Sequence, residues 1–194
     1  MTVFQLLIMG AVDPCLAGEP TQQIKQTTDK ILAILSDPAL KNPEKTQERE
    51  KLISQAIDER FDWEELARRS LARHWVQRTS EEKKEFIQLY RELVERTYLD
   101  KVEGYSGETV RYEGETIEGR YSTVKIKILT AKKTEISVEY RLMKKEPNWL
   151  VYDISIEGVS LVNNYRSQFS SFLQKSGYPE LVKRLKEKSV TEKF

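Results

Sequence analysis

The sequence predicts an α+β domain, in which a four-stranded antiparallel sheet packs against several helices. Two observations lead to this fold class. Apolar residues recur at three- and four-residue spacing from Thr21 to about residue 102, and again after Ser160, which is the helical period. Between residues 109 and 157 they alternate with polar residues instead. Because no repeat or linker interrupts this order, we predict a single domain over residues 18–194.

Capping signals mark the ends of the predicted helices. A helix from Thr21 is followed by a second from Pro43, a short one that ends at Leu71, a long one over 79–102 and a closing one from Ser160. Gly177 ends the closing helix, and a last helix begins at Pro179. The residues that we expect to cap helix N-termini are Asn42, Asp62, Thr79 with Glu82 as a capping box, and Ser160.

Four strands are predicted, over residues 109–118, 121–130, 133–144 and 148–157. Apolar residues alternate with charged ones in the second and third strands, which is typical of an antiparallel sheet with one covered and one wet face. The fourth strand is apolar in both alternating sets except at Asp153 and Ser155. We therefore expect it to be covered on both faces.

The first seventeen residues differ from the rest of the chain. An apolar run over residues 2–12 is followed by small residues, and this pattern resembles a secretory signal peptide with cleavage after Ala17. The usual positive start is missing, so Met1 fits a position inside a longer signal. The alternative is a buried N-terminal strand or helix. We predict export, with residues 1–17 as the signal peptide.

The composition argues against two classes of function. Thirty-two Lys and Arg oppose 31 Asp and Glu, for a formal net charge of +1. Nucleic-acid binders usually carry a strong basic excess, so we expect no nucleic-acid partner. One Cys and one His are too few for the usual structural zinc site, and we expect no metal.

Few residues offer catalytic chemistry. His74 lacks a spaced carboxylate and nucleophile, so we expect a structural role for it. Asp153 lies in an otherwise apolar strand, where a carboxylate must be hydrogen-bonded or have a shifted pKa. It could be a general base in the pocket of a cone-shaped α+β enzyme, or an anchor that pairs with Arg166. We favour the structural pair of Asp153 and Arg166 and predict no enzyme activity.

Two groups of motifs resemble a known family. The first runs from Phe61-Asp62-Trp63 through Arg69-Ser70-Leu71-Ala72-Arg73-His74-Trp75 to Thr97-Tyr98. The second comprises Val138-Glu139-Tyr140-Arg141-Leu142, Trp149-Leu150-Val151-Tyr152-Asp153-Ile154, Ile156-Glu157-Gly158-Val159-Ser160-Leu161-Val162 and Asn164-Tyr165-Arg166-Ser167-Gln168-Phe169. In order and layout these are similar to the signatures of the MlaC family, periplasmic phospholipid carriers of ABC transport systems that are also known as toluene-tolerance auxiliary proteins. The resemblance covers roughly residues 20–188. Ala72 departs from it, because the family often has Gly there, and we expect little change in packing.

The resemblance implies a function and a site. It implies a monomeric periplasmic carrier that holds the acyl tails of a glycerophospholipid in an apolar pocket between sheet and helices. Its partners would be an inner-membrane ABC transporter complex and an outer-membrane lipoprotein complex, and its role would be in outer-membrane lipid asymmetry. The phospholipid is cargo, and no cofactor is implied. An envelope adaptor that binds no lipid remains a third alternative, beside the enzyme. Our candidates for the pocket lining, each of which could equally be ordinary core, are Leu93, Tyr98, Val138, Tyr140, Val151, Val162 and Phe169.

Overall fold

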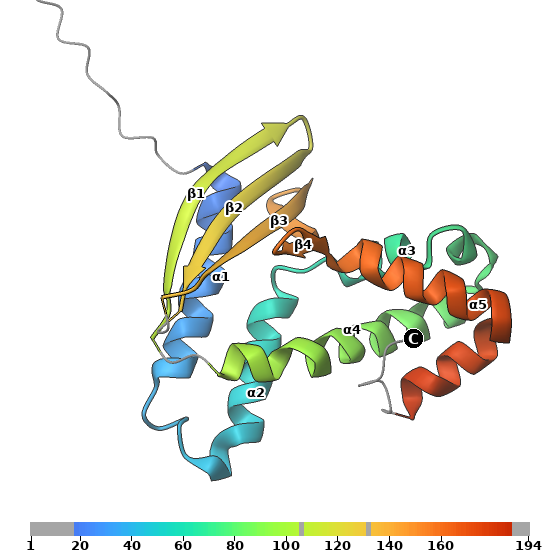
Figure 1. Cartoon of the computed structure of the whole chain (residues 1–194), viewed down its shortest axis with the longest axis horizontal. Helices are drawn as coiled ribbons and strands as arrows, with labels where there is room; N and C mark the ends of the chain where they lie inside the picture. The colour runs from blue at the N-terminus through green and yellow to red at the C-terminus, as the bar shows by residue number, and fades with distance from the viewer. Residues whose placement is uncertain (1–17, 105–106, 131–132, 188–194) are drawn as a thin grey trace, which may run out of the picture.

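The computed structural model describes residues 18–104, 107–130 and 133–187 (Figure 1). The predicted signal peptide, with Cys15, lies outside these residues. In the described part of the chain there are five α-helices, two short 3-10 segments and one five-stranded antiparallel sheet, which confirms the α+β class. The helices are α1 (Glu19–Ser36), α2 (Thr46–Asp58), α3 (Trp63–Leu71), α4 (Ser80–Glu103) and α5 (Leu161–Lys186), with 3-10 segments η1 (Pro43–Lys45) and η2 (Ala72–Gln77). None of these helices is long and apolar enough to cross a membrane.

The sheet has its strands in sequence order, β1 to β5. Its strands are β1 (Thr109–Glu118), β2 (Tyr121–Leu129), β3 (Glu135–Lys145), β4 (Asn148–Ile156) and β5 (Val159–Ser160). Four strands were expected from the sequence, and the structure adds a fifth, the short strand β5. Glu157 and Gly158 both have positive φ, 48° and 78°, and such a tight turn returns Val159 to pair with Ile156.

A bulge in β4 decides which side chains share a face of the sheet. In the register with β3, Asp153 lies opposite Arg141 and Val151 lies opposite Leu142, so Tyr152 is the extra residue. Ile154 therefore lies on the same face as Val151, although the two are an odd number of positions, three, apart in the sequence. We call this face, which α1 covers in part, the inner face, and the opposite one the outer face.

The predicted caps of three helices are present. Asp62 accepts a hydrogen bond from the backbone N–H of Glu65 at the start of α3, and the Ser160 hydroxyl accepts one from Asn163 at the start of α5. Thr79 and Glu82 form the expected capping box of α4. Gly177, at φ 76°, interrupts α5 where the closing helix was predicted to end.

Polar contacts fix α1 against the sheet. Glu115 of β1 accepts hydrogen bonds from the backbone N–H of Thr21 at 2.9 Å and from its hydroxyl at 2.6 Å. The buried guanidinium of Arg60 donates to Gln23, to Thr27 and to the backbone oxygen of Trp149. Both contacts join residues far apart in the sequence, so they set the position of the helix over the inner face.

Apolar side chains form two clusters. The helical cluster joins α3, η2, α4 and α5, and the sheet cluster joins α1 to the inner face. In Figure 1, α1 runs along the sheet, and α3 and α5 extend to the side of β4. Phe61 packs against both clusters. The helical cluster includes Leu66, Leu71, Trp75, Phe86, Tyr90, Leu93, Val162, Tyr165, Phe169, Tyr178, Leu181 and Leu185; the sheet cluster is Ile24, Val124, Ile126, Val138, Leu142, Trp149 and Val151.

Ala72 ends α3 in an unusual backbone conformation, with φ 48° and ψ −121°. Glycine adopts this region readily, whereas a Cβ is strained there. Alanine in place of the family's glycine therefore strains the backbone at this position. It changes packing little, as expected, because the Ala72 side chain is exposed.

Candidate functional site

One end of the inner face carries apolar side chains that the fold covers only in part. Near the β3–β4 hairpin, Val124, Leu142 and Val151 have no exposed surface. Toward the other end of the same strands, the apolar residues are only partly buried. We call them the open inner zone: Val110, Ile128, Ile136, Ile154 and Ile156. Contiguous half-covered aliphatic surface of this kind marks a place for an apolar ligand or partner.

The register shows that the open inner zone is continuous. Val110 lies opposite Ile128 across β1 and β2, and Ile128 lies opposite Ile136 across β2 and β3. Ile154 and Ile156 lie on β4, two residues apart, and Ile156 is opposite Val138. All four long strands therefore contribute to one apolar surface.

α1 contacts the strands of this zone, and α4 and α5 are its neighbours along the chain. α4 leads directly into β1 at its Thr109 end, and α5 begins just after the turn that follows β4. α1 contacts β1, β2 and β4 on the inner face. Figure 1 shows the C-terminal end of α4 close to the same ends of the strands. The zone thus lies at the end of the sheet from which the chain connects to α4 and to α5.

Tyr140 lies on the inner face beside the open inner zone, opposite Ile154. Its side chain keeps some accessible surface, yet burial among protein atoms raises its pKa to about 12. The phenol is therefore largely, but not completely, covered by protein atoms. Its hydroxyl has no hydrogen-bond partner among the described residues.

The seven candidates for the pocket lining are divided between the two clusters. Val138, Tyr140 and Val151 belong to the sheet cluster or pack against it, whereas Leu93, Tyr98, Val162 and Phe169 belong to or pack against the helical cluster. Val151 and Phe169 have no exposed surface, so a ligand would reach them only if neighbouring side chains moved. Tyr98 is half-buried, and burial raises its pKa.

Sequence reasoning did not single out the open inner zone. Alternation in β2 and β3 places Ile128 and Ile136 on the covered face, but it cannot show that they are covered only in part. Ile154 and Ile156 follow the bulge at Tyr152, and strict alternation counted from Val151 puts them on the wrong face. A bulge in the middle of a strand leaves no clear sequence signal here.

Asp153 is an anchor on the outer face, but its ion-pair partner is not the predicted one. Its side chain, 5% exposed, accepts hydrogen bonds from Arg141 at 3.2 Å, from the Ser160 hydroxyl at 2.7 Å and from the backbone N–H of Val162 at 3.0 Å. Arg166 instead donates to the backbone oxygen of Arg69 at 2.9 Å. The bulge in β4 explains the correction, because it sets Asp153 directly opposite Arg141. With three donors, the carboxylate holds the first turn of α5 to the sheet.

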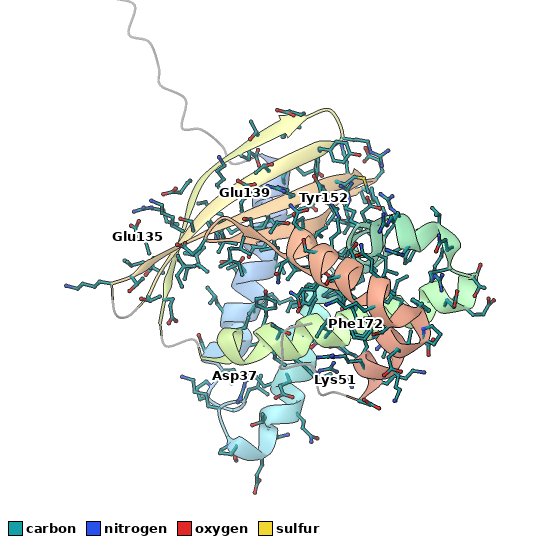
Figure 2. All side chains as sticks on the ribbon, turned by 45° about the vertical axis from the view of Figure 1, so that its right-hand side comes forward. Asp37, Lys51, Glu135, Glu139, Tyr152 and Phe172 are labelled. Carbon is teal, nitrogen blue, oxygen red and sulfur yellow. The ribbon has the colours of Figure 1, made fainter. Side chains whose placement is uncertain are left out.

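A separate groove of about 350 Å³ lies on the sheet. Tyr152 in its wall is stacked by the Arg69 guanidinium at 4.1 Å and meets the Tyr121 ring edge-on at 5.9 Å. Figure 2 shows Tyr152 on the sheet at the side nearer α3. The groove is lined by hydroxyl and charged side chains, so it is unsuited to acyl tails. Its lining residues are Thr116, Glu118, Tyr121, Ser122, Thr123, Arg141 and Tyr152.

The remaining polar candidates form no reactive site. His74 lies in η2, where partial burial and the neighbouring charges of Arg73 and Arg78 lower its pKa. The neutral ring accepts a hydrogen bond from Arg73. Within residues 18–104, 107–130 and 133–187, no group of three or more acidic, His or Cys side chains could hold a metal ion.

Similar proteins include one whose structure was solved with a ligand. The phospholipid-binding protein from Ralstonia solanacearum, in complex with a phospholipid, superposes with a TM-score of 0.79 at 27% identity; the match covers 88% of this chain and 96% of that one. The intermembrane phospholipid transport system binding protein MlaC of Haemophilus influenzae is 21% identical over 122 residues, which are 60% of this chain and 57% of that protein. A 55-residue segment is 36% identical to 2% of a DExH-box RNA helicase from Arabidopsis thaliana.

The two curated relatives match this chain over only part of their own length. The chain spans less than two thirds of the length of either curated relative, and the helicase match is too short to indicate a function. The family model described as MlaC protein, in contrast, matches residues 25–187, from α1 to the end of α5. With the same fold in the Ralstonia protein, this match shows that the chain belongs to the MlaC family.

Proposed function

We propose that this protein is a phospholipid carrier that binds the acyl tails of a glycerophospholipid against the open inner zone. The observation that carries this proposal is the contiguous, half-covered aliphatic surface of Val110, Ile128, Ile136, Ile154 and Ile156 on the covered side of the sheet. The phospholipid bound to the Ralstonia relative supports the choice of ligand.

The energetics of tail binding suit such a surface. Each methylene removed from water contributes roughly 0.8 kcal/mol, so a tail needs a dry aliphatic wall and few polar contacts. The aliphatic side chains also lose their own contact with water when a tail covers them. The net charge of +1 gives no overall field to attract an anionic headgroup, so the tails dominate recognition.

The wider role follows from the family. We propose that the protein acts in the periplasm and moves phospholipid between an outer-membrane lipoprotein complex and an inner-membrane ABC transporter complex. The name of the Haemophilus relative, an intermembrane phospholipid transport binding protein, supports this assignment. The lining role of Leu93, Tyr98, Val138, Tyr140, Val151, Val162 and Phe169 is part of the same proposal, with Tyr140 and Val138 nearest to the open inner zone.

Analysis of the lipid that purifies with the protein tests the proposal. The protein is isolated without detergent, extracted with organic solvent, and the extract is analysed by mass spectrometry. We expect diacyl phospholipid in near-stoichiometric amount. Ile154→Glu, which places a charge in the open inner zone, should abolish the bound lipid, whereas Lys125→Glu on the exposed side of β2 should not. Protein that carries no lipid, and takes up none from vesicles, would contradict the carrier and favour the adaptor.

A further inference from the structure

Tyr140 differs from most of the other deeply placed tyrosines in its hydrogen bonding, and from Tyr112 in its accessibility. Tyr90 receives a bond from Ser70 at 2.9 Å, Tyr165 lies 3.3 Å from the Thr97 hydroxyl, and Tyr178 donates to the backbone oxygen of Glu82 at 3.0 Å. Tyr112 lies beside Thr28 of α1, but its hydroxyl is fully buried and makes no hydrogen bond within the described residues. The Tyr140 hydroxyl also has no partner in the described part of the chain, but unlike that of Tyr112 it keeps accessible surface that a ligand can reach.

The surroundings of Tyr140 make the absence of a partner costly once a ligand excludes water from its hydroxyl. Val124 and Ile154 lie opposite it on the two neighbouring strands, and Val138 and Leu142 lie on either side along β3. When a bound lipid covers the open inner zone and excludes water, a hydroxyl left among aliphatic groups without a hydrogen bond costs about 1–3 kcal/mol, and phenylalanine would fill the same space without that cost. An acceptor on the lipid would remove this cost, and the described residues supply none.

The electrostatics around Tyr140 limit what that partner can be. Burial and the neighbouring Tyr112 ring are what raise its pKa, and no cationic side chain contributes. The phenol thus stays protonated and acts as a hydrogen-bond donor at neutral pH. An anionic phosphate here would have no positive charge to balance it, whereas a neutral carbonyl oxygen would need none. In a glycerophospholipid, the neutral acceptors next to the tails are the ester carbonyls.

We propose that the Tyr140 hydroxyl donates a hydrogen bond to an ester carbonyl of the bound lipid, so that the site prefers ester-linked to ether-linked chains. This inference rests on the proposed carrier function. The bond would fix the depth to which the lipid enters, with the glycerol ester at Tyr140 and the tails along the open inner zone. An ether-linked chain of equal length covers the same aliphatic surface but offers no carbonyl.

Competition between two matched lipids tests the proposal. Delipidated protein is loaded with a fluorescent phospholipid, which is displaced by dipalmitoyl phosphatidylcholine or by its dihexadecyl ether analogue. We expect the wild-type protein to prefer the ester lipid about fivefold to tenfold, the factor that one net hydrogen bond provides. Tyr140→Phe should bind both lipids equally, at the affinity that the wild type shows for the ether lipid. Tyr152→Phe, which removes a hydroxyl in the separate groove, should keep the preference.

The outcomes separate this inference from the function on which it rests. Equal wild-type affinity for the two lipids, or an ester preference that survives in Tyr140→Phe, overturns the role of Tyr140 and leaves the carrier intact. Failure of both lipids to displace the probe overturns the carrier itself and the inference with it. The wild-type comparison needs no substitution, and thermal unfolding of Tyr140→Phe shows whether the variant is folded.

Discussion

The helical and sheet clusters differ in how completely the fold covers them. In the helical cluster, Phe86, Tyr90 and Phe169 have no exposed surface, and their ring centroids lie 5.6–5.9 Å apart. In the sheet cluster, full burial near the β3–β4 hairpin gives way to partial burial in the open inner zone. The difference fits the proposed function: the helical half is a closed core, and the sheet half keeps apolar surface that the proposed lipid would cover.

The largest expected contrast is between truncations in the two halves. Phe169→Ala removes a ring from a closed cluster and should lower the free energy of unfolding by about 3–5 kcal/mol. Ile156→Ala removes methyl groups that are already partly exposed and should cost about 1–2 kcal/mol, with a clear loss of bound lipid. Urea unfolding of the delipidated proteins measures both. Equal costs at the two positions would mean that the sheet end is filled core.

Enlargement at two inner-face positions gives a second contrast. Val151→Trp places a large side chain where no space is exposed, and overpacking should cost about 1–3 kcal/mol or more. Ile136→Trp, in the open inner zone, should change stability by less than about 1 kcal/mol and displace the lipid by occupying its place. Bound lipid and the urea midpoint are measured on the same preparations. A strongly destabilised Ile136→Trp would argue against free space at that position.

Local signals explain why the helix caps could be predicted from the sequence while parts of the site could not. The capping box of Thr79 and Glu82 depends on residues three positions apart, and it formed as expected. The partner of Asp153 depends on the register across two strands, which the bulge at Tyr152 shifts.

The open inner zone could not be predicted for a related reason. The periodicity of β2 shows that Ile126 and Ile128 share a face, yet only Ile126 is buried, with 3% of its surface exposed. Coverage of a residue depends on how helices distant in the sequence pack over it. Sequence pattern therefore identifies which face is apolar, and tertiary packing decides which part of that face stays open.

The junction of α3 and η2 allows the helical half to be made more stable. Ala72 is held at φ 48° and ψ −121°, so Ala72→Gly should relieve strain and raise the free energy of unfolding by about 1 kcal/mol. Ala67→Gly, in the buried interior of α3, should have the opposite sign, because glycine there only weakens the helix. Thermal unfolding of both variants checks the difference in sign, and lipid binding should be unchanged in Ala72→Gly.

The stability of the protein at acid pH tests the ion pairs that Glu65 forms on α3 with Arg68 and Arg69. Hydrogen bonds from Arg68, and then from Arg69, lower the pKa of Glu65 from 4.5 to about 2 against the opposing effect of burial. The carboxylate therefore contributes stability above pH 4.5, and this contribution is lost as the pH falls toward 2.

Its size should be on the order of 1 kcal/mol, because Arg68 is half exposed and solvent screens the pair. Glu65→Gln should remove this part of the loss of stability between pH 4.5 and 2, as followed by urea unfolding at each pH. The exposed neighbour Glu64, changed to Gln, should leave the acid profile almost unaltered. A wild-type profile that Glu65→Gln does not change would show that the three side chains contribute nothing net.

The smallest expected effect is at the attachment of α1 to the sheet. Gly18 has φ −68° and ψ 175°, which any residue adopts, so its backbone gives no reason for glycine. A Cβ at Gly18, however, would lie 1.6 Å from Oε1 of Glu115, the carboxylate that accepts both hydrogen bonds from Thr21. Gly18→Ala should therefore push the Glu115 side chain away and weaken those bonds, at a cost of about 0.5–1 kcal/mol.

A double-mutant cycle isolates this steric cause. Replacing Glu115 by Ala removes the three heavy atoms that lie nearest to the Gly18 Cβ position, all of which belong to the Glu115 carboxylate. Gly18→Ala in that background should be neutral or slightly stabilising, because alanine reduces the conformational entropy of the unfolded chain. Urea unfolding of the four proteins gives the coupling free energy. A cost for Gly18→Ala that persists without Glu115 would mean that the glycine serves another purpose and that the clamp on α1 is looser than its hydrogen bonds indicate.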